Sequence, residues 1–216
     1  NIRILTTPYF TNYDPDHDEN TEISKIGRIE SIQVEDLLER PAIDINTNNV
    51  GAILSNQVVL VTGGAGSIGS EIVRQIANFK PTAIILMEIA ESPLHDLTID
   101  LRRRYPHLQF VPIIADVRDI HMVEEVFAEY HPTVIFHAAA YKHVPLMEDF
   151  PTQAIMANVL GTKNMADMAI KYNAERFVMI STDKAVNPTN VMGASKRIAE
   201  IYVQSLFLKQ VQKDAN

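Results

Sequence analysis

The residues with the clearest chemical meaning form a glycine-rich turn at residues 63–69, which reads GGAGSIG. An apolar run at residues 58–62 leads into it, and an amphipathic stretch at residues 71–79 follows it. Glycines three residues apart let the chain reverse tightly and approach a pyrophosphate, which the N-terminus of the next helix attracts. The turn therefore predicts a dinucleotide site. The residues expected to contact the dinucleotide are Gly63, Ala65, Gly66, Ser67, Ile68 and Gly69.

An acidic residue at the end of the second apolar run indicates which dinucleotide binds. Glu88 follows the glycine turn by about 20 residues, the spacing at which a carboxylate accepts hydrogen bonds from an adenosine ribose. This carboxylate would repel a 2′-phosphate, and no arginine stands immediately beside it in the sequence. We therefore expect NAD as the cofactor in preference to NADP. The alternative for Glu88 alone is a solvated acid at a strand end.

Two further segments would complete the cofactor site. Asp116 and Val117 close the third apolar run and are placed to meet the adenine edge. Ala138, Ala139 and Ala140 close the fourth run, where such small side chains would let a ribose and nicotinamide lie against the backbone. The alternatives are a turn aspartate and ordinary core or helical alanines. The place of both segments in the series of strands favours the cofactor site.

The elements that must position these residues alternate between strand and helix from residue 57 onward. We predict strands at 58–62, 83–88, 109–115, 134–138 and 177–181, and helices at 67–79, 93–105, 120–130, 151–172 and 191–211. The strands are nearly continuous apolar runs, which is typical of strands buried on both faces. Short connections and right-handed crossovers then predict an α/β fold with a doubly wound parallel sheet, the Rossmann fold.

The first 56 residues differ in character from the rest, and we expect them to form a connector and N-terminal arm. Residues 3–5 could form a strand, the polar and acidic residues 11–20 predict a loop, and a short helix is expected around Val34. Residues 43–56 predict another loop with a helical turn at its end. Residues 57–216 are then the NAD-binding domain.

Composition narrows the classes of partner. The chain has 216 residues, a formal net charge of -8 and 46% hydrophobic residues, which argues against a nucleic-acid surface. It contains no cysteine, so it offers no disulfide, no thiolate nucleophile and no cysteine zinc site, and we predict no metal site. The lack of cysteine also fits a reducing cytoplasm, where we expect the domain to lie. No apolar run approaches the ~18 residues that span a bilayer, so we expect a soluble fragment.

The chain stops on its last predicted helix. A sheet of this type is expected to continue with at least one more strand, and a second domain would be needed to cover a substrate. We therefore expect the chain to be a segment of a longer protein, truncated before its C-terminal substrate domain, and inactive by itself.

Three longer motifs carry a resemblance to a known family. They are HAAAYKHVPLME at residues 137–148, NVLGT at residues 158–162 and STDKAVNPTNVMGASK at residues 181–196. From about residue 27 onward the chain resembles the UDP-N-acetylglucosamine 4,6-dehydratases, extended short-chain dehydrogenases of bacterial surface polysaccharide and capsule synthesis. The resemblance implies a UDP-sugar substrate and retention at C5. Because longer members carry an N-terminal membrane region, it also implies a parent protein at the inner membrane with this domain on the cytoplasmic side.

One position departs from the general short-chain pattern. Most such enzymes have a tyrosine four residues before a lysine, whose ammonium group lowers the phenol pKa. Here that position is Met192, whose thioether cannot accept a proton, while Lys196 can still bind the nicotinamide ribose. The longer 4,6-dehydratases share this methionine, so it supports the resemblance. Outside this motif, a methionine that fills core space would be the default interpretation.

The expected chemistry needs a base and an acid. Removal of hydride from C4 of the sugar acidifies the proton on C5, the C6 hydroxyl then leaves, and hydride returns to C6. By resemblance, Asp183 is the acid, Lys184 is the base, which requires a lowered pKa, and Thr182 is the partner of the C4 hydroxyl. Adjacent strand residues point to opposite faces, so the backbone must leave β geometry there. The alternative is a local surface ion pair.

Lys142 and His143 follow the fourth strand and are candidates to reach the sugar or its diphosphate. An inverting dehydratase or an epimerase of the same fold is a close alternative, although such enzymes typically keep the tyrosine. A cofactor-binding module without catalysis is a second alternative. Related enzymes pair two long helices across a dimer, so we expect a homo-oligomer.

Overall fold

The computed structural model describes residues 5–6, 30–31 and 47–214, and the chain divides into two compact units, residues 1–46 and 47–216. In the first unit, β1 (Leu5–Thr6) pairs antiparallel with β2 (Glu30–Ser31). The strand predicted at residues 3–5 overlaps β1 only at Leu5. The loop predicted at residues 11–20 and the helix predicted around Val34 lie outside the described residues.

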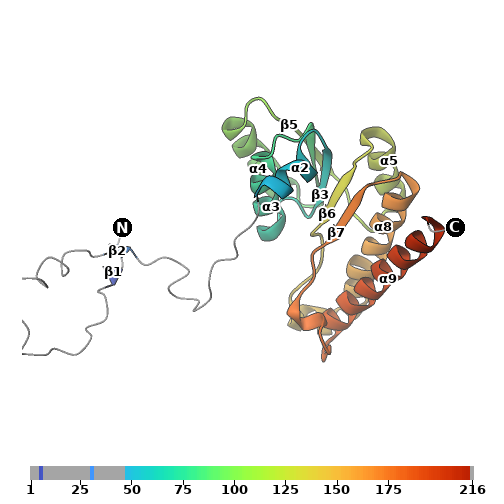
Figure 1. Cartoon of the computed structure of the whole chain (residues 1–216). Coiled ribbons are helices and arrows are strands. Elements are labelled where there is room, and N and C mark those ends of the chain that lie inside the picture. Colours follow the sequence, from blue (N-terminus) through green and yellow to red (C-terminus); the bar gives the residue numbers. More distant parts are fainter. Residues whose placement is uncertain (1–4, 7–29, 32–46, 215–216) are drawn as a thin grey trace, which may run out of the picture. The chain divides into compact units, whose positions relative to one another are not determined.

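The second unit is built on one parallel sheet of five strands (Figure 1). These are β3 (Val58–Thr62), β4 (Ala83–Glu88), β5 (Gln109–Ile114), β6 (Val134–His137) and β7 (Arg176–Met179). Their order is β5-β4-β3-β6-β7, which confirms the predicted doubly wound sheet. The chain moves outward from β3 to β5 and then returns to β6 on the other side of β3. Sheets of this kind bind ligands at the carboxyl edge where the order reverses.

Three strands end one or two residues before their predicted ends. The next amides still bond to the neighbouring strand, since Ala115 N donates to Glu88 O at 3.1 Å and Ile180 N donates to His137 O at 3.0 Å. Beyond these bonds the backbone leaves the sheet. The predicted ligand-binding residues that follow these three strands therefore lie outside the sheet, at its carboxyl edge.

Helices cover both faces of the sheet. They are α2 (Thr47–Leu54), α3 (Ser67–Ala77), α4 (Glu91–Arg104), α5 (Ile120–Tyr130), α8 (Thr162–Lys171) and α9 (Val191–Asp214). Figure 1 shows α2, α3 and α4 on one side and α5, α8 and α9 on the other. α2 lies within the stretch for which we expected a connector. None of the helices in the described part of the chain is long and apolar enough to cross a membrane.

Each face of the sheet has its own apolar core, because alternate strand residues point in opposite directions. Val59 and Val61 face a core with Val73 of α3. Leu60 and Ile85 face the other core with Phe127 of α5. All six of these side chains have 0% exposure, so the strands are held from both sides and their carboxyl ends are fixed.

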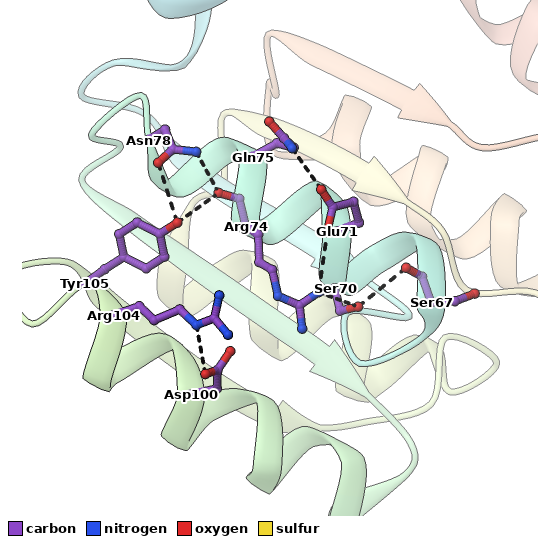
Figure 2. A network of polar contacts seen from close by, with 9 residues as sticks. All are labelled: Ser67, Ser70, Glu71, Arg74, Gln75, Asn78, Asp100, Arg104 and Tyr105. Atoms are coloured by element: carbon purple, nitrogen blue, oxygen red, sulfur yellow. Dashed lines mark hydrogen bonds and ion pairs between the residues drawn. The ribbon is translucent and has the colours of Figure 1, made fainter. Parts of the chain in front are cut away.

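The helix after the glycine turn is also held at its far end by polar contacts with Tyr105, the residue that follows α4. Figure 2 shows this network, in which the hydroxyl of Tyr105 lies 3.4 Å from Arg74 O and Asn78 Nδ2 donates to the same oxygen at 3.1 Å. Nearer the turn, Arg74 Nη1 donates to Ser70 Oγ at 3.3 Å. Exposed polar pairs of this kind stabilise little by themselves, so the apolar core supplies most of the anchoring of α3.

The helix predicted at residues 151–172 has a different internal geometry. It runs as α7 (Pro151–Ala154), the π-helix η1 (Ile155–Gly161) and α8, and a separate short helix α6 (Val144–Asp149) precedes it. Tertiary contacts accompany the π-helix, since Asn158 is buried within it and a Cβ on Gly161 would lie 2.7 Å from Val117 Cγ2. The 3.6-residue periodicity of the sequence predicts neither the burial of Asn158 nor the contact of Gly161 with Val117.

Candidate cofactor and active site

A pocket of about 280 Å³ lies at the carboxyl edge of the sheet. Its lining brings together most of the residues predicted to bind the cofactor, from four separate segments of the chain. These are Gly63, Gly66, Ser67, Ile68, Gly69, Glu88, Asp116, Val117, Ala138, Ala139 and Ala140, and Lys142 lines it too. Ala65, His143 and Lys196 do not line it. The pocket is also lined by Met87, Arg118 and Tyr141, which were not predicted as ligand contacts.

The glycine turn packs directly on the end of β6. Gly63 has φ +64, and a Cβ added there would lie 2.7 Å from Ala139 N. A Cβ on Gly69 would lie 2.0 Å from Gly63 O, so the first turn of α3 sits against the glycine turn itself. The N-cap of α3 is Gly66, which carries no side chain over the helix end. The start of α3 is thus open toward the pocket, as binding of a pyrophosphate requires.

Glu88 is held beside the glycine turn by three backbone amides. Its Oε1 accepts from Ile89 N at 2.9 Å and Ala90 N at 3.1 Å, and its Oε2 accepts from Ala65 N at 3.3 Å. Ala65 therefore contributes to the site through Glu88. The fixed carboxylate lines the pocket with lone pairs still free to accept hydrogen bonds, because a carboxylate has about four acceptor positions.

Asp116 is paired with an arginine at the same pocket. Arg118 Nε donates to Asp116 Oδ2 at 2.7 Å and Arg118 Nη1 donates to Gln153 Oε1 at 2.8 Å. Asn164 holds this loop, because its Nδ2 donates to Val117 O at 3.0 Å. The hydrogen bond from Arg118 lowers the pKa of Asp116, so the carboxylate is ionised at neutral pH. No arginine neighbours Glu88 in the sequence, yet the fold brings Arg118 to the same pocket.

A buried polar chain links the glycine turn to the π-helix. Thr162 Oγ1 donates to Asn158 O at 2.7 Å, so its oxygen accepts from His137 Nε2 at 2.9 Å. His137 Nδ1 then accepts from Thr62 Oγ1 at 2.7 Å, and Thr62 Oγ1 accepts from Ala139 N at 3.3 Å. Burial, followed by the charge of Lys196, lowers the pKa of His137 to about 3, which keeps the ring neutral.

Asn158 occupies the centre of this region. Its Oδ1 accepts from Tyr141 N at 2.8 Å, and its Nδ2 donates to Tyr141 O at 3.0 Å and to Ser195 Oγ at 2.9 Å. One buried amide thus ties the loop after β6 to α9. The signal that could have revealed this role was a polar residue within the apolar pattern of residues 151–172. Asn158 belongs to the NVLGT motif at residues 158–162, which by itself predicted no contact for it.

Asp183 and Lys184 lie on a 3-10 turn, η2 (Asp183–Ala185), so the backbone does leave β geometry after β7. Thr182 Oγ1 donates to Asp183 Oδ1 at 2.9 Å, and Lys184 Nζ lies 3.2 Å from the same oxygen. The Asp183 side chain is 85% exposed. The hydrogen bond from Thr182, and then Lys184, lower the pKa of Asp183, so in this state it is a carboxylate paired with an ammonium.

Met192 and Lys196 lie near the start of α9 and contact different parts of the protein. Met192 is 2% exposed and packs with Met147 and Ala154 in a small core. Lys196 is 4% exposed, and its Nζ donates to Ile180 O at 2.7 Å. Burial lowers the pKa of Lys196 to about 8. The methionine thus fills core space, while the lysine reaches the loop that carries Asp183.

Lys142 and His143, which follow the alanines after β6, lie in different surroundings. Lys142 Nζ lies 3.4 Å from Ser67 Oγ at the start of α3, across the pocket. His143 is the exposed N-cap residue of α6. The lysine is therefore placed over the end of the glycine turn, where a pyrophosphate is expected.

Comparison with known proteins identifies the family. A family model described as "Polysaccharide biosynthesis protein" matches residues 59–216. The chain belongs to this polysaccharide biosynthesis family. The "Capsular polysaccharide biosynthesis protein CapD" of Staphylococcus aureus is 48% identical over 183 residues, 84% of this chain and 31% of that protein. The chain thus spans about a third of the length of this family member.

Solved structures agree with the family assignment. Pen from Bacillus thuringiensis is 30% identical, with a TM-score of 0.66, over 70% of this chain and 47% of that one. The UDP-glucose 4-epimerase of Thermus thermophilus, solved in complex with NAD, is 26% identical, with a TM-score of 0.54, over 68% of this chain and 50% of that one. The polysaccharide biosynthesis domain therefore has the fold of nucleotide-sugar epimerases and dehydratases.

Proposed function

We propose that this domain is the NAD-binding part of a nucleotide-sugar 4,6-dehydratase, a lyase that acts on UDP-N-acetylglucosamine and retains the configuration at C5. The observation that carries the proposal is the burial of Met192 at the position of the usual proton acceptor. A buried thioether cannot take part in proton transfer. The exposed turn with Thr182, Asp183 and Lys184 follows β7 on the same carboxyl edge and carries groups that can.

The residues around the pocket fit a dinucleotide. The open start of α3 would hold the pyrophosphate, Glu88 the adenosine ribose, and Asp116 with Val117 the adenine. The backbone at residues 138–140 would lie along the nicotinamide half, whose ribose Lys196 would reach. NAD bound there would supply the hydride acceptor and donor for the proposed reaction. NAD is favoured over NADP because the fixed Glu88 carboxylate would repel a 2′-phosphate.

The proposed reaction requires one proton to move from Lys184 to Asp183 before elimination begins. In water the pair exists as the Asp183 carboxylate and the Lys184 ammonium, because the exposed charged forms are well solvated. Elimination needs the reverse arrangement, with a neutral lysine that accepts the C5 proton and a protonated Asp183 that donates to the leaving C6 oxygen. A substrate that covers the turn removes water and so favours the neutral pair. Thr182 would bind the C4 hydroxyl.

The family supports the wider biological proposal. The capsular relative named above suggests that the product enters bacterial surface polysaccharide synthesis. The parent protein would act on the cytoplasmic side of the inner membrane, as a homo-oligomer, with residues 1–56 as connector and residues 57–216 as the NAD-binding domain. A substrate domain would follow, so residues 1–216 alone would bind NAD and turn over little substrate.

The test uses the full-length protein with UDP-N-acetylglucosamine in D₂O, followed by proton NMR of the product. We expect a 4-keto-6-deoxy sugar with retained configuration at C5 and deuterium at that carbon. Inversion at C5 would identify an inverting dehydratase, and a C4 epimer without loss of water would identify an epimerase. The absence of any product would contradict the proposal.

A second test separates catalysis from simple binding. Asp183→Asn and Lys184→Ala in the full-length protein should each lower kcat by about 10²-fold or more, since each removes a general acid or base. NAD affinity should stay within about twofold, because neither residue lines the cofactor pocket. Unchanged turnover in both variants would favour a cofactor-binding module without catalysis.

A further inference from the structure

One face of α9 touches the segment after β7 at three points. Gly193, Lys196 and Glu200 are spaced three and four residues apart, so they lie on the same side of the helix. Lys196 Nζ donates to Ile180 O at 2.7 Å, and Ser181 Oγ donates to Glu200 Oε1 at 2.6 Å. Two side-chain hydrogen bonds thus hold the beginning of the segment that leads to the 3-10 turn.

The third point is a backbone approach that requires glycine. A Cβ added to Gly193 would lie 2.1 Å from the carbonyl oxygen of Lys184 and 3.0 Å from its carbonyl carbon. A backbone carbonyl cannot swing aside as a flexible side chain can. The start of α9 is itself held, because Gly193 N donates to Asn190 Oδ1 at 2.8 Å and Val191 N donates to Glu148 Oε1 at 2.7 Å. A larger residue would therefore displace the Lys184 side of the contact.

We propose that Gly193 is a positioning residue of the active site. Its missing side chain lets α9 set the place of the turn that carries Asp183 and Lys184, while the contacts of Lys196 and Glu200 set its beginning. This inference rests on the proposed function, because it assigns Gly193 a task in the reaction of those two side chains.

The turn is short enough to move as a unit. It is closed by hydrogen bonds from Ala185 N to Thr182 O at 3.1 Å and from Val186 N to Asp183 O at 3.0 Å. Displacement of the carbonyl of Lys184 would either carry the whole turn along or open these bonds. A misplacement of about 1 Å can lower a rate by about 10²-fold. The cofactor pocket has no part in this contact and should keep its shape.

The test compares Gly193→Ala with Gly51→Ala in the full-length protein. Gly51 lies within α2, and a Cβ there would be 3.5 Å from Phe79 Cδ1, an ordinary contact. For Gly193→Ala we expect kcat to fall by about 10²-fold with an NAD Kd within about twofold of wild type. In hydrogen exchange, the amides of Ala185 and Val186 should exchange at least tenfold faster, while those of residues 63–69 stay unchanged. Gly51→Ala should change none of these values.

Exchange is measured independently of activity, so the two proposals can fail separately. If the wild-type protein showed no turnover, the proposed function would be contradicted. Faster exchange in Gly193→Ala would still support the positioning contact. Unchanged exchange and kcat in Gly193→Ala would overturn the inference. If that variant does not fold, Ser181→Ala removes another of the three contacts. It should lower kcat severalfold with NAD affinity preserved, and an unchanged kcat would overturn the inference.

Discussion

The ammonium nitrogen of Lys196 lies 2.7 Å from the carbonyl oxygen of Ile180, two residues before Thr182. This bond joins the lysine expected at the cofactor to the backbone that leads to the proposed acid and base. An ammonium group has three protons, so the same lysine can keep this bond and also donate to a ribose hydroxyl. If Lys196 binds the ribose as proposed, cofactor binding and the position of the turn depend on the same residue.

Replacement of Lys196 by methionine should change how stability depends on pH. Burial lowers the pKa of Lys196 to about 8, below its unfolded value of 10.5. The unfolded chain then binds more protons between these values, so wild-type stability should rise with pH in this window relative to Lys196→Met. Across this window the free energy of unfolding of the wild type should rise by at most about 3 kcal/mol relative to that of Lys196→Met. Urea unfolding from pH 7 to 10 measures it, and Lys209→Met, at an exposed site, should show no such difference.

Replacement of His137 by glutamine should flatten acid destabilisation. The pKa of His137 is lowered to about 3 by burial, against 6.5 when unfolded, so wild-type stability falls as pH drops through this window. Glutamine can accept from Thr62 and donate to Thr162 without titrating in this range. Between pH 6.5 and 4, the free energy of unfolding of His137→Gln, measured by urea unfolding, should therefore rise by about 3 kcal/mol relative to that of the wild type. Parallel pH curves would contradict this, and exposed His107→Gln is the control.

Replacement of Glu88 by serine should weaken NAD binding and relax the choice between NAD and NADP. Loss of a hydrogen-bonded charge costs about tenfold in affinity, and loss of the repulsion should favour NADP. The ratio of the two Kd values, measured by calorimetry, should shift by about tenfold or more. Glu91→Gln, at the exposed first residue of α4, should leave the ratio unchanged. An unchanged ratio in Glu88→Ser would show that other residues determine the preference for NAD over NADP.

Replacement of Lys142 by methionine decides between two ligands for this residue. Its position 3.4 Å from Ser67 Oγ favours the cofactor pyrophosphate, so we expect the NAD Kd to rise about tenfold and to depend less on salt. If Lys142 instead meets the sugar diphosphate, the KM for the UDP-sugar would rise while the NAD Kd stays constant. Lys213→Met, near the end of α9, is the matched control.

Much of the fold and the cofactor pocket was predictable from local pattern. Apolar runs at strand length and the glycine spacing act over a few residues, so they identified β3, β4 and the turn between β3 and α3. The strand order then follows from handedness and short connections. Because parallel strands share one carboxyl edge, Glu88, Asp116 and Ala138 were expected to meet, and the structure brings them to one pocket.

The strand–helix alternation and the glycine turn follow from the amino-acid sequence, because each depends on neighbours along the chain, and the candidate acid and base follow from the resemblance of residues 181–196 to a known family. Tertiary structure alone decided the π-helix around Asn158, the neutral state of His137, the burial of Met192 and the approach of Gly193 to Lys184. These depend on the close packing of segments far apart in sequence. Where such segments are in direct contact, a single Cβ or a single buried proton decides which arrangement is stable.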